Sequence, residues 1–349
     1  MSYDPERFLG APRVVVKARL NPLIGTRFQP TGFPNLGAAE YQLPSRDQAK
    51  RIKCLLVESP QSIANHLEKT IWDDSSDDVL PDFQGLPYVR AIVDGEPTDS
   101  IQEAHRLNSP YLVEGLKAQL MARAEIKEKK KVASGKKVAK NDDVAADGED
   151  SESSSGVDTR KLARAVFYYD PNSVLHGVFL EKIVGLARLT RVVSGFIEAT
   201  GVEVVQSGGV KNDRVDPSGK RYGGAAKGFG NVPYSKAEYA AETIEASFSF
   251  DAARLRAYGF APEAQRLLLS LALWKIGTFL NDGARLRTAC DLIGDESGLV
   301  VQIPNGVAFP ARPELLADVK AQIAQCTNAG LFADPAVTTV AFPAKADTK

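Results

Sequence analysis

The pattern of apolar and polar positions predicts strands and helices interspersed along most of the chain. Runs of β-branched and other apolar residues predict strands at 13–20, 51–57, 86–93, 173–179, 192–198, 243–250 and 282–292. Apolar residues at helical spacing predict helices from Ser59 onward and at 109–124, 262–280 and 313–325. Ser59 is suited to cap its helix, because a proline follows it at the first helical position.

The order of these elements predicts the fold class. Strands and helices follow one another irregularly, which favours an α+β fold over a doubly wound parallel sheet. A four-stranded ferredoxin-like core with large insertions fits this order.

A strongly charged segment interrupts the helical part of the chain. Residues 123–140 carry eight basic and two acidic side chains, and residues 142–158 carry seven acidic and no basic ones. Such a segment cannot bury enough apolar surface to offset its conformational entropy. The sequence therefore predicts a disordered insertion at 125–158.

Overall composition indicates a globular protein. Of 349 residues, 44% are apolar and 25% are charged, and the formal net charge is −1. A nucleic-acid surface must therefore come from local clustering of basic residues. The three cysteines form no CxxC pair, which argues against a zinc knuckle or a disulfide framework. The N-terminus has no apolar signal region and no run is long enough to span a membrane, so we expect a cytoplasmic protein without a membrane partner.

One glycine-rich segment, 207–230, concentrates the basic charge. Its 24 residues include seven glycines, five lysines or arginines and two aspartates, with Tyr222 and Phe229 interleaved. Basic side chains suit phosphate, and aromatic rings suit base stacking. Glycine and charge also make ordinary surface loops, so composition alone leaves both interpretations open.

Motifs for catalysis are not found in this sequence. The three histidines have no metal-ligand spacing, and HExxH, the P-loop ending GK[ST], the Rossmann fingerprint and GxSxG do not occur. This favours binding over catalysis, with no cofactor and no metal expected.

Four separated segments resemble one protein family in the same order along the chain. They are SPQSIANHLE from Ser59, LHGVF from Leu175, VVSGFIEATGVE from Val192 and RLRTACDL from Arg285. Together they resemble the RAMP-superfamily backbone subunit of type I-U (also called I-G) CRISPR effector complexes, a Cas-seven-like protein of Cascade. The charged segment 125–158 does not belong to that pattern.

The resemblance implies a fold, a function and partners. The fold would be one RAMP-type domain over 1–349, with an RRM-like, ferredoxin-type palm, an inserted helical subdomain and a thumb-like β-hairpin. The function would be a non-catalytic, RNA-binding backbone subunit that polymerises along CRISPR RNA and presents it for pairing with target DNA. The partners would be CRISPR RNA, target DNA through the guide, neighbouring copies of itself and other Cascade subunits.

A subunit that accepts any guide sequence should contact phosphate and sugar rather than base edges. The basic residues that we expect to make these contacts from the palm are Lys17, Arg19, Arg188, Arg191, Arg285 and Arg287. We expect segment 207–230 to be the thumb. The residues of this segment that we expect to contact RNA are Lys211, Arg214, Lys220, Arg221, Tyr222, Lys227 and Phe229.

Two alternatives remain open at this point. A RAMP endoribonuclease that cuts CRISPR precursor or target RNA would use His176, Asp213 or Asp282. A small-molecule enzyme would use the glycine-rich segment as a lid over a phosphate, but the missing phosphate-binding motifs weigh against it.

Overall fold

The computed structural model of the chain describes residues 3–33, 37–47, 51–126, 157–184, 187–221 and 223–342. The predicted disordered insertion lies outside this part of the chain except at its ends. Two compact units interleave along the sequence. The first comprises Met1–Gly85, Arg191–Arg256 and Ala261–Ala329, and the second comprises Leu86–Thr190, Ala257–Phe260 and Gly330–Lys349.

The first unit is built on a seven-stranded antiparallel sheet in the order β14-β15-β1-β13-β12-β5-β4. The strands are β1 Val14–Pro22, β4 Glu40–Gln42, β5 Lys53–Glu58, β12 Val193–Lys211, β13 Val232–Phe250, β14 Ala284–Arg287 and β15 Cys290–Ile303. The helices are α1 Pro5–Gly10, α2 Pro60–Lys69, α8 Pro262–Asn281 and α9 Arg312–Asn328, and α7 Ala252–Ala257 ends at the boundary between the units. This unit also contains two short antiparallel strand pairs. In one, β2 Gly32–Phe33 pairs with β3 Gly37–Ala38, and in the other, β6 Trp72–Asp73 pairs with β7 Asp78–Val79.

The central strands have a ferredoxin-like arrangement. Along the chain the order is β1, α2, β12, β13, α8 and β15, and in the sheet the four strands are neighbours as β15-β1-β13-β12. This is the βαββαβ motif with its two middle strands joined as a hairpin. The predicted α+β class with a ferredoxin-like core is confirmed.

The core of the first unit lies on one face of this sheet. On β1, Val14, Val16, Ala18 and Leu20 are buried, and the residues between them are more exposed. Helices α2 and α8 pack against the sheet and against each other, so both cover that buried face, and α9 packs on α8. Helix α8 is therefore buried along most of its length, as its broad apolar surface predicts.

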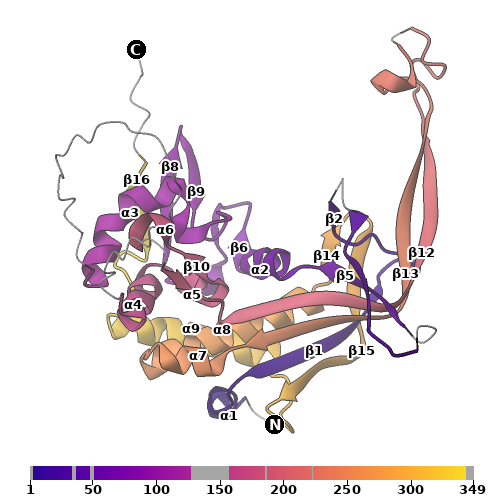
Figure 1. The fold of residues 1–349 in the computed structure, drawn as a ribbon. Helices are drawn as coiled ribbons and strands as arrows, with labels where there is room; N and C mark the ends of the chain where they lie inside the picture. Colours follow the sequence, from indigo (N-terminus) through magenta and orange to yellow (C-terminus); the bar gives the residue numbers. More distant parts are fainter. Residues whose placement is uncertain are drawn as a thin grey trace, which may run out of the picture. The chain divides into compact units, whose positions relative to one another are not determined.

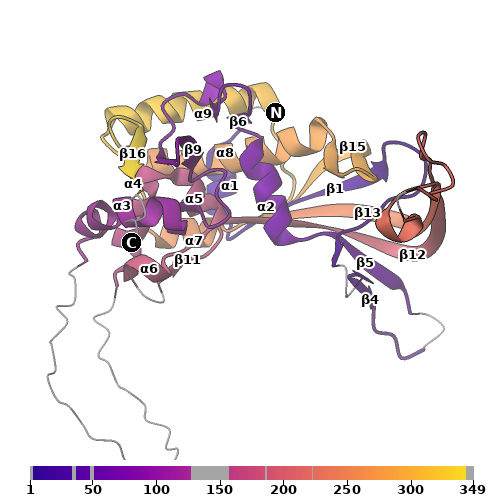
Figure 2. The same cartoon turned by 90° about the horizontal axis from the view of Figure 1, so that it is seen from above.

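Strands β12 and β13 continue far beyond the sheet (Figures 1 and 2). They pair with each other from Val193↔Phe250 to Lys211↔Val232, whereas β1 pairs with β13 only as far as Ile244. We call residues 202–211 and 232–241 the ribbon, and residues 212–231 the tip. Gly201, with φ +64°, lies where the ribbon leaves the sheet.

The extent of the glycine-rich loop differs from the prediction. Residues 207–211 belong to β12 and pair with residues 232–236, so the loop between the strands is shorter than 207–230. Glycines are unfavourable in an isolated strand, but here the register is continued from the paired strands of the core.

The second unit combines a small sheet with short helices. Its strands β8 Tyr88–Val93, β9 Glu96–Asp99 and β16 Val337–Ala341 have the order β16-β8-β9, and β10 Val178–Phe179 pairs with β11 Arg188–Leu189. Its helices are α3 Pro110–Arg123, α4 Thr159–Tyr169, α5 Pro171–His176 and α6 Glu181–Val184.

Two predicted strands are wrong. Residues 171–176 form helix α5, because the Asp170 carboxylate accepts hydrogen bonds from the N–H groups of Asn172 (2.9 Å) and Ser173 (3.2 Å) and Pro171 starts the helix. The run 282–292 is not one strand but β14 and β15, joined by a turn.

Two further expectations concern membranes and thiols. Among the described residues, no helix is long and apolar enough to cross a bilayer. The three cysteines are free and buried, and burial raises the pKa of Cys290 to about 11.

Candidate nucleic-acid interface

The tip is organised by the carboxylate of Asp213. This carboxylate accepts hydrogen bonds from the backbone N–H groups of Val215 (2.9 Å), Asp216 (3.0 Å) and Gly230 (2.9 Å). The side-chain oxygen of Asn231 accepts one from the Asp213 N–H (2.8 Å). The backbone donors, with Asp216 first, hold the pKa of Asp213 below its usual value. One carboxylate thus joins the two ends of the tip.

A second carboxylate, Asp216, holds the interior of the tip. It is 6% exposed and accepts hydrogen bonds from the Ser218 hydroxyl (3.0 Å) and the Arg221 N–H (2.9 Å). Gly219 and Gly230 have positive φ, and a Cβ on Gly230 would lie 2.9 Å from the Gly219 nitrogen. The glycines therefore permit a compact turn in which both aspartates face the backbone.

The backbone of the tip itself thus binds both carboxylates, whereas the basic residues of segment 207–230 are exposed. All five are exposed, and none forms an ion pair within the described part of the chain: Lys211, Arg214, Lys220, Arg221 and Lys227. Phe229 is 41% exposed beside them, and Tyr222 lies outside the described residues. The end of the ribbon is therefore a cationic surface suited to phosphate.

The palm candidates on β1 lie on the face of the sheet that α2 and α8 leave open. Lys17 Nζ lies 2.5 Å from a carboxylate oxygen of Glu245, and Arg19 is opposite the same glutamate in the strand register. Tyr41 donates a hydrogen bond (2.7 Å) to Glu198, another acidic side chain of this sheet. Acidic partners therefore offset the positive charge on this face.

The two candidates on β14 differ in their surroundings. Arg287 forms an ion pair with Glu58, which is 1% exposed, and donates a hydrogen bond to the Gln29 carbonyl (3.0 Å). Arg285 is exposed, and a register shift separates it from Arg287. Arg287 thus has a structural role in the first unit.

The remaining two palm candidates lie in different units. Arg188 belongs to the second unit, with its guanidinium carbon 5.1 Å from the centre of the Phe179 ring. Arg191 belongs to the first unit and donates a hydrogen bond to the Gln61 side chain. Of the predicted residues, the structure brings together those of the tip, and their contact with RNA stays a prediction.

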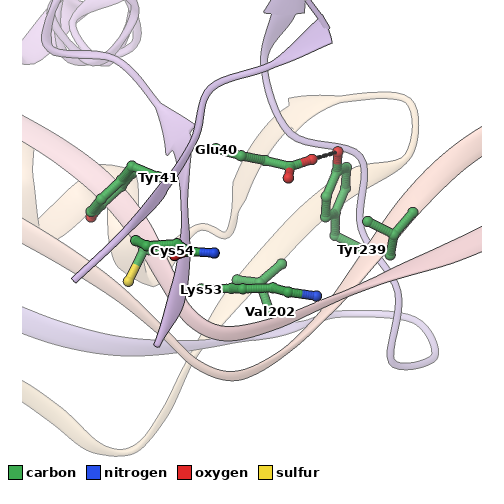
Figure 3. A pocket seen from close by; sticks show the side chains of 8 residues that line it. Glu40, Tyr41, Lys53, Cys54, Val202 and Tyr239 are labelled. Carbon is green, nitrogen blue, oxygen red and sulfur yellow. Dashed lines mark hydrogen bonds between the residues drawn. The ribbon is translucent and has the colours of Figure 1, made fainter. Parts of the chain in front are cut away.

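A pocket of about 230 Å³ at the base of the ribbon contains residues that sequence reasoning missed (Figure 3). Its lining residues are Glu40, Tyr41, Gln42, Lys53, Cys54, Val202, Val204 and Tyr239. The Tyr239 hydroxyl donates to the Glu40 carboxylate, and burial first and this bond second raise the pKa of Tyr239 to about 12. The phenol is thus a neutral hydrogen-bond donor near pH 7. Sequence alone gave no signal for this pocket, because only the packing of β4 and β5 beside the ribbon forms it.

The residues of the endoribonuclease alternative are dispersed. His176 is 1% exposed and belongs to the second unit. Asp213 is bound by the backbone of the tip, and Asp282 forms an ion pair with Arg312 (2.6 Å). Among the residues that the structure describes, no group of three His, Cys, Asp or Glu side chains is placed to hold a metal ion.

Comparison with known proteins gives a match to a family model and distant likenesses to solved structures. No curated protein matches the chain. A chain in a solved structure titled "CRISPR RNA-guided surveillance complex, pre-nicking" is similar, with 13% identity, a TM-score of 0.39, and coverage of 81% of this chain and 74% of that chain. A likeness this distant assigns no residue a role.

The family match concerns residues 14–204, which is more than half of the chain. They fit the family model described as CRISPR-associated protein GSU0053. This range includes the three motifs that begin at Ser59, Leu175 and Val192, and the resemblance to CRISPR-associated proteins is confirmed. The chain belongs to the family of the CRISPR-associated protein GSU0053.

Proposed function

We propose that this chain is an RNA-binding backbone subunit of a type I CRISPR surveillance complex, with several copies arranged along one guide RNA. The observation that carries the proposal is the cationic tip at the end of the ribbon. Four basic side chains of the tip, and Lys211 at the adjoining end of the ribbon, are exposed without an ion pair among the described residues, and the two aspartates of the tip are bound by backbone N–H groups. Membership of a CRISPR-associated family supports a guide RNA as the anionic ligand.

The chemistry of the tip suits a ligand that differs in sequence from one guide to another. Lysine and arginine bind phosphate whatever base is attached, and this contact is weakened by salt. Specificity for a target is then left to base pairing between the guide and DNA. The partners in this proposal are the guide RNA, neighbouring copies of the chain, other subunits of the complex and target DNA through the guide.

We propose binding rather than cleavage. A metal-independent ribonuclease needs an acid or base that reaches the RNA, and His176 is buried. Asp213 and Asp282 both have partners within the protein. Incubation of labelled precursor RNA with the protein, with and without magnesium, tests this choice. Cleavage that is lost in His176→Ala or Asp282→Ala would establish the endoribonuclease instead.

The central experiment is co-expression of the full-length protein with its CRISPR array and partner subunits. We expect the purified complex to contain RNA of a defined length and several copies of this chain. A protein that stays monomeric and carries no RNA under these conditions would contradict the proposal.

A further inference from the structure

One face of the ribbon carries a tyrosine that lies over a glycine of the opposite strand. Tyr234 on β13 is the register partner of Gly209 on β12. A Cβ placed on Gly209 would meet the Tyr234 hydroxyl oxygen at 3.2 Å and two ring carbons at 3.4 Å. The phenol end of Tyr234 thus occupies the space that a side chain at Gly209 would fill.

The neighbouring glycine brings the two strands close together. A Cβ on Gly208 would lie 2.3 Å from the backbone carbonyl oxygen of Tyr234, a distance that no side chain at this position can adopt without moving the backbone. Despite these contacts on its inner side, Tyr234 is 55% exposed. The glycine pair therefore holds a mostly solvent-exposed aromatic ring above bare backbone.

Two lysines belong to the same face of the ribbon as this ring. Register partners lie on one face of a strand pair and alternate residues share that face, which places Lys211, opposite Val232, and Lys236, opposite Ser207, on either side of Tyr234. Lys236 forms an ion pair with Glu238, with 2.7 Å between the Lys236 Nζ atom and a carboxylate oxygen. Lys211 forms no ion pair within the described residues and lies diagonally to Tyr234, a separation of about 7–8 Å for such neighbours.

We propose that Tyr234 and Lys211 form a binding site for one nucleotide of single-stranded RNA. The base stacks on the tyrosine ring, and the phosphate of that nucleotide contacts the Lys211 ammonium. Stacking on an aromatic ring tolerates any base, which a guide-binding surface requires. This site rests on the proposed function, and it adds a contact with the base that the tip cations do not provide.

A different role for Tyr234 is to cover the glycine backbone and stabilise the ribbon. A large apolar residue would also fill that role, whereas stacking requires a ring. Tyr234→Phe and Tyr234→Leu therefore form a matched pair of variants. Because the side chain is mostly exposed, we expect both variants to keep the thermal unfolding temperature of the wild-type protein.

The experiment measures the affinity of the full-length protein for fluorescein-labelled oligo-uridine RNA by fluorescence anisotropy. Tyr234→Leu should weaken binding by about 5-fold to 150-fold, the range for loss of one stacked base, and Tyr234→Phe should bind as the wild type does. An abasic RNA of the same length removes the stacking partner. The wild-type protein should bind the abasic RNA as weakly as Tyr234→Leu binds oligo-uridine. Tyr234→Leu should bind the abasic RNA and oligo-uridine with the same affinity.

Salt dependence separates the ring from the lysine. Lys211→Ala should reduce the slope of log K against log salt by about 0.7, the contribution of one phosphate contact to a single strand, and Tyr234→Leu should leave the slope unchanged. Unchanged affinity in Tyr234→Leu, or an equal loss in Tyr234→Phe, would overturn the stacking site while leaving the RNA-binding function in place. A wild-type protein that binds neither RNA would overturn the proposed function itself.

Discussion

Removal of four basic side chains from the ribbon end gives the most direct test of the cationic tip. The variant replaces Lys211, Arg214, Lys220 and Arg221 by alanine. All four are exposed and free of ion pairs with the described residues, so no carboxylate is left without a partner. We therefore expect the thermal unfolding temperature of the variant to match that of the wild type.

The expected effect on RNA binding follows from the number of charges. Each phosphate contact contributes about 0.7 to the slope of log K against log salt for a single strand, so four contacts contribute about 2.8. When salt rises from about 50 to 200 mM, the wild-type protein should lose about 50-fold more affinity than the variant. A titration of labelled oligo-uridine at several salt concentrations measures both slopes.

A matched control removes the same charge elsewhere in the first unit. Its alanine substitutions are at exposed basic residues of helices α1, α2, α7 and α9: Arg7, Lys69, Arg254 and Lys320. Lys320 forms a half-exposed ion pair with Asp82 (2.8 Å), and losing such a surface pair costs little stability. The control should keep the wild-type salt slope, because these side chains lie on helices and not on the ribbon. If the control lowers the slope as much as the tip variant does, net charge and not the tip determines binding, and our reasoning fails.

Three further predictions concern single residues. Gly208→Ala should force the strands apart at the Tyr234 carbonyl, at a cost of about 1–3 kcal/mol, and hydrogen exchange of the ribbon amides should become faster while that of the core does not. Arg287→Ala should leave the Glu58 carboxylate, which is 1% exposed, without its charged partner and lower the free energy of unfolding by about 3–5 kcal/mol in urea titrations; a change below about 1 kcal/mol would show that the pair is not structural. Backbone hydrogen bonds lower the pKa of Asp213 in the folded protein. The stability that its ionised carboxylate gives to the tip should therefore be fully present above the unfolded pKa of about 3.9, and it should be lost as the pH falls through the lower pKa of the folded protein. NMR of the Gly230 amide should follow that transition, and a midpoint at or above about 3.9 would contradict the geometry of the tip.

Local signals in the sequence were sufficient for helices α2, α3, α8 and α9 and for strands β1, β5 and β8. Ser59 caps α2 by accepting a hydrogen bond from the Ser62 N–H (3.3 Å), as its position before a proline predicts. The error at 173–179 arose because a short apolar run does not distinguish a buried strand from a buried helix. The Asp170–Pro171 pair, which precedes it, was the signal that identifies the helix.

The candidate site was predictable in composition but not in geometry. The charge at 207–230 is visible in the sequence, and the basic residues of the tip do lie together. The role of Asp213 in turn formation and the position of Tyr234 over Gly209 depend on which residues of β12 and β13 face each other. That register is determined by tertiary packing of the two strands in the core, which no local pattern reveals.

The continuity of β12 and β13 from core to tip limits how the ribbon can vary in length. Because register partners in the core are buried in alternation, a shift of one residue would turn the apolar side chains of the sheet toward solvent. Adding one residue to each strand would likewise turn the tip to face the opposite direction, whereas adding two to each would restore its orientation. The reach of the ribbon can therefore change only in steps of two residues per strand, about 7 Å, so any surface that fits the tip must be spaced accordingly.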